Sequence, residues 1–337
     1  MVAASPALQL FDLIQSHRIT AVIYVAARLG LAELLRNGPQ SPGQLAAATG
    51  ADRQSLERLL RALLTLGLCT YAENGYSLTE TGAALDGDAD RSFRNWAIFE
   101  GQMLSRTWSG MLESVLTGKT AAELQGFGSS FELMSRDAEN VQIFNAAMAD
   151  LTRLVIQDVL RAYDFGHISH LLDVGGGSGE LIGAVARKYN HIRGTVFDLP
   201  RCADTARAHL DRVGVSDRAG FVAGDFFAGV PAGADSIVLK SVVHDWNDER
   251  SGVILRNCRR ALAQNGVLIV IERIMPEAPA VKDEDKSHAM SDLNMMRGPG
   301  GCERTKKQYR DLLAKSHFHI KSISPAGRFS IIAARAS

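Results

Sequence analysis

The sequence predicts an α/β protein in which a mainly helical N-terminal part precedes a doubly wound, mostly parallel sheet. Two observations support this prediction. From residue 168 onward, short apolar runs alternate with amphipathic stretches, the pattern of strands and helices in a sheet covered on both faces. Before that point, apolar residues recur at the three- and four-residue spacing of helices. With 337 residues, the chain is long enough for two or three domains.

Composition restricts the class of protein and its partners. Lys plus Arg and Asp plus Glu each total 37, so the formal net charge is zero, which argues against nucleic acid or an anionic membrane as a partner. The four cysteines lie far apart and form no CxxC pair, so we expect a reducing cytoplasm, no disulfide and no zinc cluster. We expect no signal peptide, and no apolar run approaches the ~20 residues of a membrane helix.

Residues 1–95 are expected to form a winged-helix-like domain. Ser41 to Gln44 make a capping box that begins one helix, and residues 52–67 place leucines on one face of a second helix. Asn74-Gly75 then marks a hairpin between two short strands. Such a domain binds DNA or packs subunits together. Because acidic residues interrupt the arginines of the second helix, we expect a dimerisation domain.

Residues 96–165 are expected to form a helical connector rich in aromatic residues. Aromatic side chains at helical spacing usually belong to the core, although some could line a pocket for a flat ligand. The aromatic residues in question are Trp96, Phe99, Trp108, Phe127, Phe131 and Phe144.

A glycine-rich turn follows the first predicted strand of the sheet. In LLDVGGGSGELIGAV, Gly175, Gly177 and Gly179 separate a strand from a helix, where glycine lets a ligand lie against the backbone at the helix N-terminus. Asp198 ends the next strand, where an acid can bind ribose hydroxyls. These residues alone fit either a dinucleotide or an adenosyl ligand.

Later features favour the adenosyl ligand. The usual dinucleotide spacing would place glycine at position 180, where this chain has Glu180. The third strand ends in Asp225-Phe226, a carboxylate for an exocyclic amine and a ring to stack on a base. The fourth strand leads into HDW at residues 244–246, at the carboxyl edge of the sheet where ligands bind in such folds.

In order, LLDVGGGSG, VFDLP, GDFF, LKSVVHDWND, VLIVIER and GGCERT resemble the motifs of plant caffeate-type and bacterial small-molecule O-methyltransferases that use S-adenosylmethionine. The resemblance covers nearly the whole chain. It implies a homodimer joined through the N-terminal domain, a Rossmann-like catalytic domain at 166–337, an aromatic small-molecule substrate and no metal. DLNM at 292–295 is similar to bacterial members, which implies a polycyclic or heteroaromatic secondary metabolite.

The resemblance also implies a cofactor site. Gly175 would contact the methionine part of the cofactor, Asp198 the ribose, and Phe226 the adenine, with Lys240 and Trp246 completing the adenine wall. The full expected set is Gly175, Asp198, Asp225, Phe226, Lys240, Trp246 and, near the cofactor carboxylate, Arg153 or its neighbour Thr152.

Methyl transfer from a sulfonium needs alignment and a deprotonated acceptor. His244 is the expected general base. Complete proton transfer from a phenol of pKa ~10 to a histidine of pKa ~6.5 would cost roughly 4–5 kcal/mol, which a base acting as the methyl moves avoids. By resemblance, Glu303 would orient the imidazole, and Glu272 would assist it or contact the acceptor. Asp245 is expected to support the loop.

The acceptor site is expected to include Met148, Asn294 and Met295, again by resemblance. Three alternatives stay open. An N-methyltransferase acting on a nitrogen heterocycle would need no base. A winged-helix regulator that senses an adenosyl ligand would bind DNA, and an NAD-dependent reductase would bind NADH.

Overall fold

The computed structural model describes residues 5–336, which divide into two compact units. The first unit comprises the chain up to Trp108 together with Glu139–Leu151, and the second comprises Ser109–Ala138 and the chain from Thr152 onward. Helices of the segment 96–165 therefore belong to both units, and the expected boundaries at 95 and 165 stay a prediction. Among the described residues, no helix is long and apolar enough to span a membrane.

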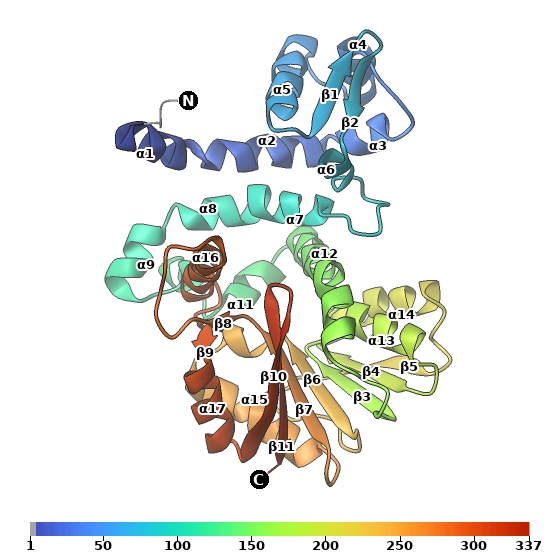
Figure 1. Ribbon diagram of the computed structural model, residues 1–337, viewed down its shortest axis with the longest axis vertical. Coiled ribbons are helices and arrows are strands. Elements are labelled where there is room, and N and C mark those ends of the chain that lie inside the picture. The colour runs from blue at the N-terminus through green and yellow to red at the C-terminus, as the bar shows by residue number, and fades with distance from the viewer. Residues whose placement is uncertain (1–4, 337) are drawn as a thin grey trace. The chain divides into compact units, whose positions relative to one another are not determined.

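The first unit contains the expected order of helix, helix and hairpin (Figure 1). Its elements are α1 (Pro6–Gln15), α2 (His17–Arg28), α3 (Leu31–Leu35), α4 (Pro42–Thr49), α5 (Arg53–Thr65), β1 (Cys69–Ala72), β2 (Gly75–Leu78), α6 (Glu80–Ala83), α7 (Arg94–Phe99), η1 (Glu100–Leu104) and α8 (Ser105–Trp108).

Local sequence signals explain the ends of these elements. Ser41 Oγ accepts the Gln44 N–H at 3.3 Å and Gln44 Oε1 accepts the Ser41 N–H at 2.8 Å, so the predicted capping box is confirmed. The hairpin turn lies at Glu73-Asn74, one residue earlier than its sequence signal suggests. Gly75 instead begins β2, where a Cβ would lie 2.3 Å from the carbonyl oxygen of Gln40. Glycine is therefore required by this close approach of two backbones.

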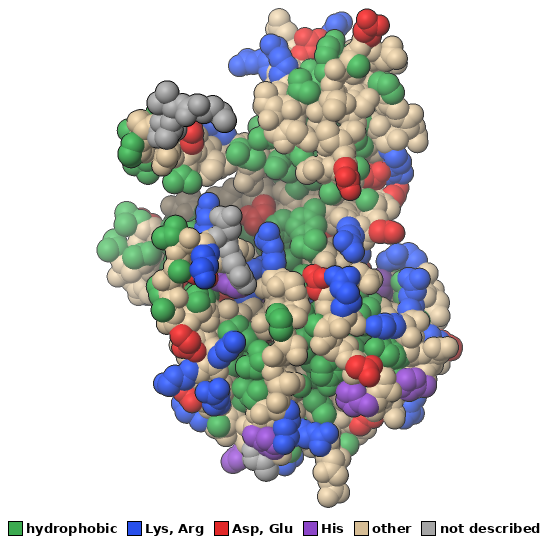
Figure 2. Space-filling view, in the orientation of Figure 1, with side chains coloured by type: hydrophobic (Ala, Val, Ile, Leu, Met, Phe, Trp, Pro, Cys, Tyr) green, Lys and Arg blue, Asp and Glu red, His purple; other side chains and the backbone are tan. Residues whose placement is uncertain are grey.

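The helix α1 leaves its apolar side chains exposed. Leu10, Phe11, Leu13 and Ile14 each expose more than half of their surface, and α1 contains no buried residue. A stripe of this kind on a folded domain usually marks an interaction surface. By contrast, charged side chains of both signs are interspersed on the face drawn in Figure 2, without a patch of one sign there.

The second unit contains the expected alternation of strands and helices. The long helix α12 (Ala138–Ala162) runs from the first unit into it. Its other elements are α9 (Met111–Thr117), α10 (Ala121–Leu124), α11 (Ser130–Ser135), β3 (His170–Val174), α13 (Glu180–Lys188), β4 (Arg193–Asp198), η2 (Pro200–Cys202), α14 (Ala203–Arg212), β5 (Ala219–Ala223), β6 (Ser236–Lys240), η3 (Val243–Asp245), α15 (Asp248–Ala261), β7 (Val267–Glu272), β8 (Ile274–Met275), α16 (Asp283–Arg297), β9 (Arg304–Thr305), α17 (Lys306–Lys315), β10 (Phe318–Ala326) and β11 (Phe329–Ala336).

Seven strands form one sheet in the order β10-β11-β7-β6-β3-β4-β5. The strands β3 to β7 are parallel to one another, and the final hairpin of β10 and β11 closes one edge, with β11 antiparallel to β7 (Figure 1). Alternate residues of β6 enter two different apolar clusters, one with α12, α13 and α14 and the other with α15 and α17. The predicted doubly wound sheet, with a parallel majority and a closing edge hairpin, is confirmed.

The strand order places a switch point between β3 and β6. From β3 the chain proceeds through β4 to β5 on one side, and it then returns to β6 and β7 on the other side. The loops that follow β3 and β6 therefore diverge at the carboxyl edge of the sheet, which leaves a crevice for a ligand. The glycine turn and the HDW segment both follow these strands.

Candidate active site

The glycine turn after β3 fits an adenosyl ligand. Gly175, Gly177 and Gly179 all have positive φ, and a Cβ on Gly177 would meet no atom within 4 Å. The turn is fastened by Asp198, which ends β4 and accepts the N–H groups of Gly177 at 2.8 Å and Leu199 at 2.6 Å. The carboxylate expected at the ribose thus also shapes the turn. The backbone of Gly177 therefore has free space beside it, and a ligand that binds close to the main chain requires such space.

Aromatic rings gather at the ends of β5 and β6. Trp246 has its ring centroid 6.2 Å from that of Phe226 and 4.8 Å from that of Phe227, and it stacks on Phe131 of α11 at 5.6 Å. Its Nε1 is buried without a hydrogen-bond partner. The structure therefore brings the expected residues Phe226 and Trp246 together. Asp225 precedes them and accepts the Phe227 N–H at 2.8 Å.

Lys240 lies apart from this aromatic group. In β6, Leu239 joins the cluster that Trp246 packs against, so strand alternation directs Lys240 to the opposite face, where its Nζ lies 5.8 Å from the ring of Phe329. Asp173 of β3 faces the same side, and burial raises its pKa to about 7 against the attraction of Lys240. The side chain of Lys240 therefore lies near the buried carboxyl of Asp173 and not with the rings of Phe226 and Trp246, and its contact with the adenine stays a prediction.

Arg153 reaches the other end of the glycine turn. Its Nη1 lies 2.7 Å from Oε1 of Glu180, the first residue of α13, and the same oxygen lies 3.4 Å from Nδ1 of His209. Burial and the neighbouring arginines lower the pKa of His209 to about 4, so this histidine is neutral at pH 7. The expected place of Arg153 near the cofactor carboxylate stays a prediction.

The turn that carries His244 is held at its N–H end by Glu272. This glutamate ends β7, and its Oε1 accepts the backbone N–H groups of Val242 at 3.0 Å, Val243 at 2.9 Å and His244 at 3.4 Å. A carboxylate at the N–H end of a helical turn satisfies donors that have no partner within the turn. Glu272 therefore fixes the backbone of the turn as well as facing the imidazole.

The C=O end of the same turn is held by Arg304. This guanidinium is 1% exposed and donates to the carbonyl oxygens of Val243 at 3.0 Å and Trp246 at 2.8 Å. Between them, the Cys302 N–H donates to the carbonyl of His244 at 3.0 Å. Sequence reasoning missed Arg304, although its place in GGCERT directly after Glu303 could have drawn attention to it.

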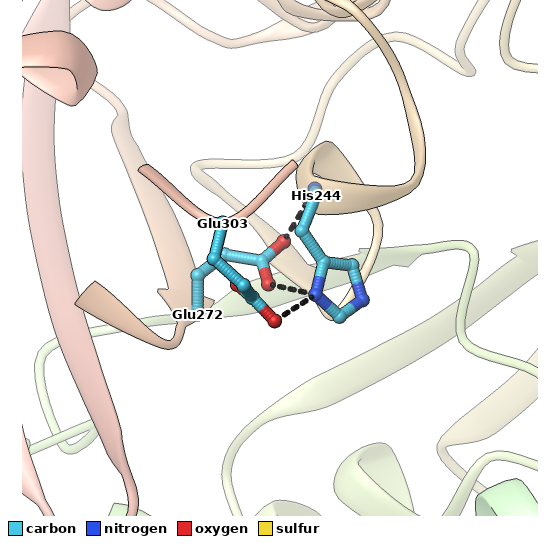
Figure 3. Close-up of side chains that lie close together, drawn as sticks. All are labelled: His244, Glu272 and Glu303. Carbon is cyan, nitrogen blue, oxygen red and sulfur yellow. Dashed lines mark hydrogen bonds and ion pairs between the residues drawn. The ribbon is translucent and has the colours of Figure 1, made fainter. Parts of the chain in front are cut away.

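The imidazole of His244 lies among three carboxylates. Nδ1 is 3.1 Å from Glu303 Oε1 and 3.5 Å from Glu272 Oε2, while Nε2 points away from both glutamates (Figure 3). Asp245 Oδ1 is 3.6 Å from Nε2. Burial alone would lower the pKa of His244, but Glu272, Glu303 and Asp245 outweigh it and raise this pKa to about 10.

The carboxyl groups around the imidazole differ in their protonation. Burial raises the pKa of Asp245 to about 7 and also raises the pKa of Glu272. For Glu303, the attraction of His244 outweighs burial and holds the pKa below its usual value. Asp245 was expected only to support the loop, yet its carboxyl lies beside the nitrogen that faces away from the glutamates. Of the three carboxyl groups, Glu303 is the one whose pKa is lowered, so contact with the imidazole favours its anionic form.

The same residues supply donors of the kind that metal ions bind. Donor atoms of His244, Glu272 and Glu303 lie within 4.8 Å of one another. The sequence predicted no metal cluster because these residues come from three separate segments without ligand spacing. Ligation at Nδ1 would have to displace a proton from a histidine whose pKa is about 10, so proton binding opposes metal binding at neutral pH.

The helix α16 carries two expected acceptor residues. Met295 is buried, and Asn294 accepts a hydrogen bond from Arg297. One turn earlier, the hydroxyl of Ser291 donates to Glu303 Oε1 at 2.6 Å. The third expected acceptor residue, Met148, lies on α12 in the first unit, and its contact with an acceptor stays a prediction.

Comparison with known proteins identifies the family. Residues 108–319 match the O-methyltransferase domain, and residues 11–86 match the O-methyltransferase dimerisation domain. The chain belongs to the O-methyltransferase family. It is 38% identical over 328 residues to the phenazine O-methyltransferase of Lysobacter antibioticus, covering 97% of this chain and 95% of the relative.

Solved structures of the family agree over the full length. A crystal structure of LaPhzM is 37% identical with a TM-score of 0.93, covering 99% of this chain and all of that one. The O-methyltransferase of neocarzinostatin biosynthesis, solved with S-adenosylmethionine and 2-hydroxy-5-methyl naphthoic acid, is 31% identical with a TM-score of 0.77, covering 95% and 96%. The chain is therefore an S-adenosylmethionine-dependent methyltransferase, which favours methyl transfer over the reductase and regulator alternatives.

The family does not by itself decide which atom is methylated. The phenazine-1-carboxylate N-methyltransferase of Pseudomonas aeruginosa is 32% identical over 318 residues, covering 93% of this chain and 93% of the relative. Nitrogen and oxygen acceptors therefore occur among relatives of similar identity. The choice between oxygen and nitrogen as the methylated atom therefore rests on the geometry around His244.

Proposed function

We propose that the protein methylates a hydroxyl of an aromatic or polycyclic small molecule, a bacterial secondary metabolite, with His244 as the general base. The observation that carries this proposal is the buried imidazole whose Nδ1 faces Glu303 and Glu272, while Nε2 points away from both. A paired carboxylate fixes the tautomer of a histidine and stabilises its imidazolium, which is what a base requires. A nitrogen heterocycle with its own lone pair would need no such arrangement.

We propose the same residues for the cofactor as the sequence predicts, with Lys240 at the end of β6 among them. Bound S-adenosylmethionine would supply a methyl group already activated by the positive charge on its sulfur. Gly175 and Asp198 would hold it at the glycine turn, Phe226 and Trp246 would flank the adenine, and Arg153 would lie toward its carboxylate. For this chain's own residues, the task is then to orient the acceptor and to move one proton.

That proton would go from the acceptor hydroxyl to Nε2 of His244, while Nδ1–H stays donated to Glu303. With the pKa of His244 at about 10 and that of a phenol near ~10, the transfer is close to thermoneutral. An unperturbed histidine would lose roughly 4–5 kcal/mol at the same step. The carboxylates thus match the base to its task, and only the minority of His244 that is neutral at pH 7 reacts.

We also propose a cytoplasmic homodimer joined through the N-terminal domain. The match to a dimerisation domain at residues 11–86 and the exposed apolar stripe of α1 support the dimer. The four cysteines are all free, as in a reducing compartment.

The test is mass spectrometry of hydroxylated aromatics and nitrogen heteroaromatics incubated with S-adenosylmethionine and either wild type or His244→Ala. His170→Ala is the matched control, because His170 lies at the start of β3, the end opposite the glycine turn. We expect an O-methylated product whose rate falls about 10²- to 10⁴-fold in His244→Ala and is kept in the control.

A methylated product that forms equally fast in His244→Ala would contradict base-assisted oxygen transfer. It would support the second candidate, methylation of a ring nitrogen, as the N-methylating relative suggests. The position of the new methyl group in the product then separates the two activities directly.

A further inference from the structure

The carboxylate of Glu303 uses one oxygen for two donors. Oε1 accepts the Ser291 hydroxyl at 2.6 Å and faces His244 Nδ1 at 3.1 Å. Oε2 is buried and has no hydrogen-bond partner. Since the side chain of Glu303 is enclosed and both donors meet one oxygen, the orientation of the carboxylate depends on these two contacts.

Ser291 supplies that hold from α16. A half-turn of the carboxylate would only exchange two equivalent oxygens, but a smaller rotation would move the oxygen away from both donors and lose both hydrogen bonds. The hydroxyl of Ser291 favours the orientation in which Oε1 lies between α16 and the imidazole. The next residue, Asp292, accepts the backbone N–H of Glu303 at 2.8 Å, so α16 fixes both the main chain and the side chain of this glutamate.

We propose that Ser291 is a positioning residue for methyl transfer: its hydroxyl holds Glu303 against Nδ1 of His244 and thereby keeps Nε2 directed at the acceptor. The inference rests on the proposed function, because a positioned base matters only where a proton is removed. It connects the base to α16, the helix that also carries Asn294 and Met295. Ser291 does not touch the reacting atoms and acts through Glu303 alone.

The experiment compares Ser291→Ala with Ser291→Thr, which keeps a hydroxyl, and with Ser287→Ala. Ser287 lies one turn earlier on α16, and its hydroxyl accepts a long hydrogen bond of 3.5 Å from Arg273, so it is a matched control. For each variant, kcat, the KM of S-adenosylmethionine and the thermal unfolding temperature are measured over about pH 6 to 11, a range that extends beyond the His244 pKa of about 10. The titration of the His244 ring is followed separately by NMR in the protein without acceptor.

We expect Ser291→Ala to lower kcat on the alkaline plateau about 10-fold, the effect of losing one hydrogen bond to a charged group, and to leave the KM of the cofactor unchanged. The His244 titration should move to lower pH, because a carboxylate that turns away no longer favours imidazolium. Ser291→Thr should restore most of kcat and the original titration. Ser287→Ala should behave as wild type.

Three outcomes would overturn the inference. In the first, Ser291→Ala keeps the wild-type kcat and the His244 titration does not move. In the second, Ser291→Ala loses kcat and unfolds at a lower temperature, but the His244 titration does not move. In the third, Ser287→Ala loses as much kcat as Ser291→Ala. Failure of the proposed function gives a different result. In that case His244→Ala keeps its activity, while the NMR titration in Ser291→Ala still reports whether Ser291 holds Glu303 against the imidazole.

Discussion

Replacing Glu303 by glutamine removes one carboxylate from His244 with little change in volume. Because a carboxylate beside an imidazole favours its protonated form, the substitution must lower the pKa of His244. Glu303 is the nearest of the three carboxylates, at 3.1 Å from Nδ1, and its own pKa is held low by that contact. The amide oxygen can still accept from Nδ1–H, so orientation is kept in part.

The size of the effect follows from the rise of the His244 pKa from 6.5 to about 10. At 1.36 kcal/mol per pKa unit this rise is worth roughly 5 kcal/mol, and the carboxylates supply more than that because burial opposes them. One of three carboxylates therefore accounts for about 1.5–2 kcal/mol or more, so the pKa should fall by about one to two units. The transition state also develops positive charge on the imidazole, so it loses a similar amount of electrostatic stabilisation.

The lower pKa of His244 and the lost stabilisation of the transition state affect different parts of the pH profile. Neutral His244 is the reactive form, so for a phenolic acceptor kcat/KM of wild type should rise with pH until about 10. In Glu303→Gln the rise should end one to two units lower, with a plateau reduced about 10- to 30-fold. At pH values well below the His244 pKa, kcat/KM of the two proteins should nearly coincide. The lost carboxylate destabilises protonated His244 and the transition state by similar amounts, so the difference in free energy between them is unchanged.

The assay is initial-rate methylation of one phenolic acceptor at saturating S-adenosylmethionine over about pH 6 to 11, for wild type and Glu303→Gln. A uniform loss of activity at every pH, with the inflection unmoved, would refute the electrostatic reasoning. Such a result would leave Glu303 a purely steric or orienting role. Binding of the cofactor, measured by calorimetry, should be the same in both proteins.

Three further predictions concern the cofactor site, the catalytic turn and the dimer. Asp198→Ala should raise the Kd of S-adenosylmethionine about 10- to 100-fold in calorimetry, whereas Asp204→Ala, an exposed acid on α14, should leave it unchanged. Arg304→Lys should lower the free energy of unfolding by about 2–3 kcal/mol in urea titration and should also reduce activity, because one ammonium cannot reach both carbonyls of the turn. An unchanged urea midpoint would contradict this. Phe11→Glu should give a monomeric mass in light scattering, while Tyr71→Glu, equally exposed on the hairpin, should stay dimeric.

The elements of the fold could be predicted because their signals are local. The capping box at Ser41 and the alternation of strands and helices after residue 168 each act within a few residues. The hairpin was displaced by one residue because Gly75 serves a contact with Gln40, which lies 35 positions earlier in the chain. A local signal for a turn could not reveal that contact.

The candidate site was predictable only as far as its motifs reach. His244 was predicted from its place after the fourth strand, and Glu272 and Glu303 by resemblance. For Lys240, the resemblance suggested a role but not the side-chain direction, which depends on the alternation along β6. Asp245 was underestimated, since the placement of its carboxyl beside Nε2 depends on how a 3-10 turn bends. Ser291 carries no sequence signal for its contact with a glutamate 12 residues later.

The two ends of the catalytic turn are held by residues far away in the chain, and this has a consequence for how the protein refolds. Glu272 lies 28–30 residues beyond the groups it holds, and Arg304 lies 61 residues beyond Val243. Contacts of such separation close large loops and form late, after local helices and neighbouring strands. Methyl transfer should therefore return more slowly than helical circular dichroism when the denatured chain is diluted into buffer, and the rate of that return would report the closing of this turn.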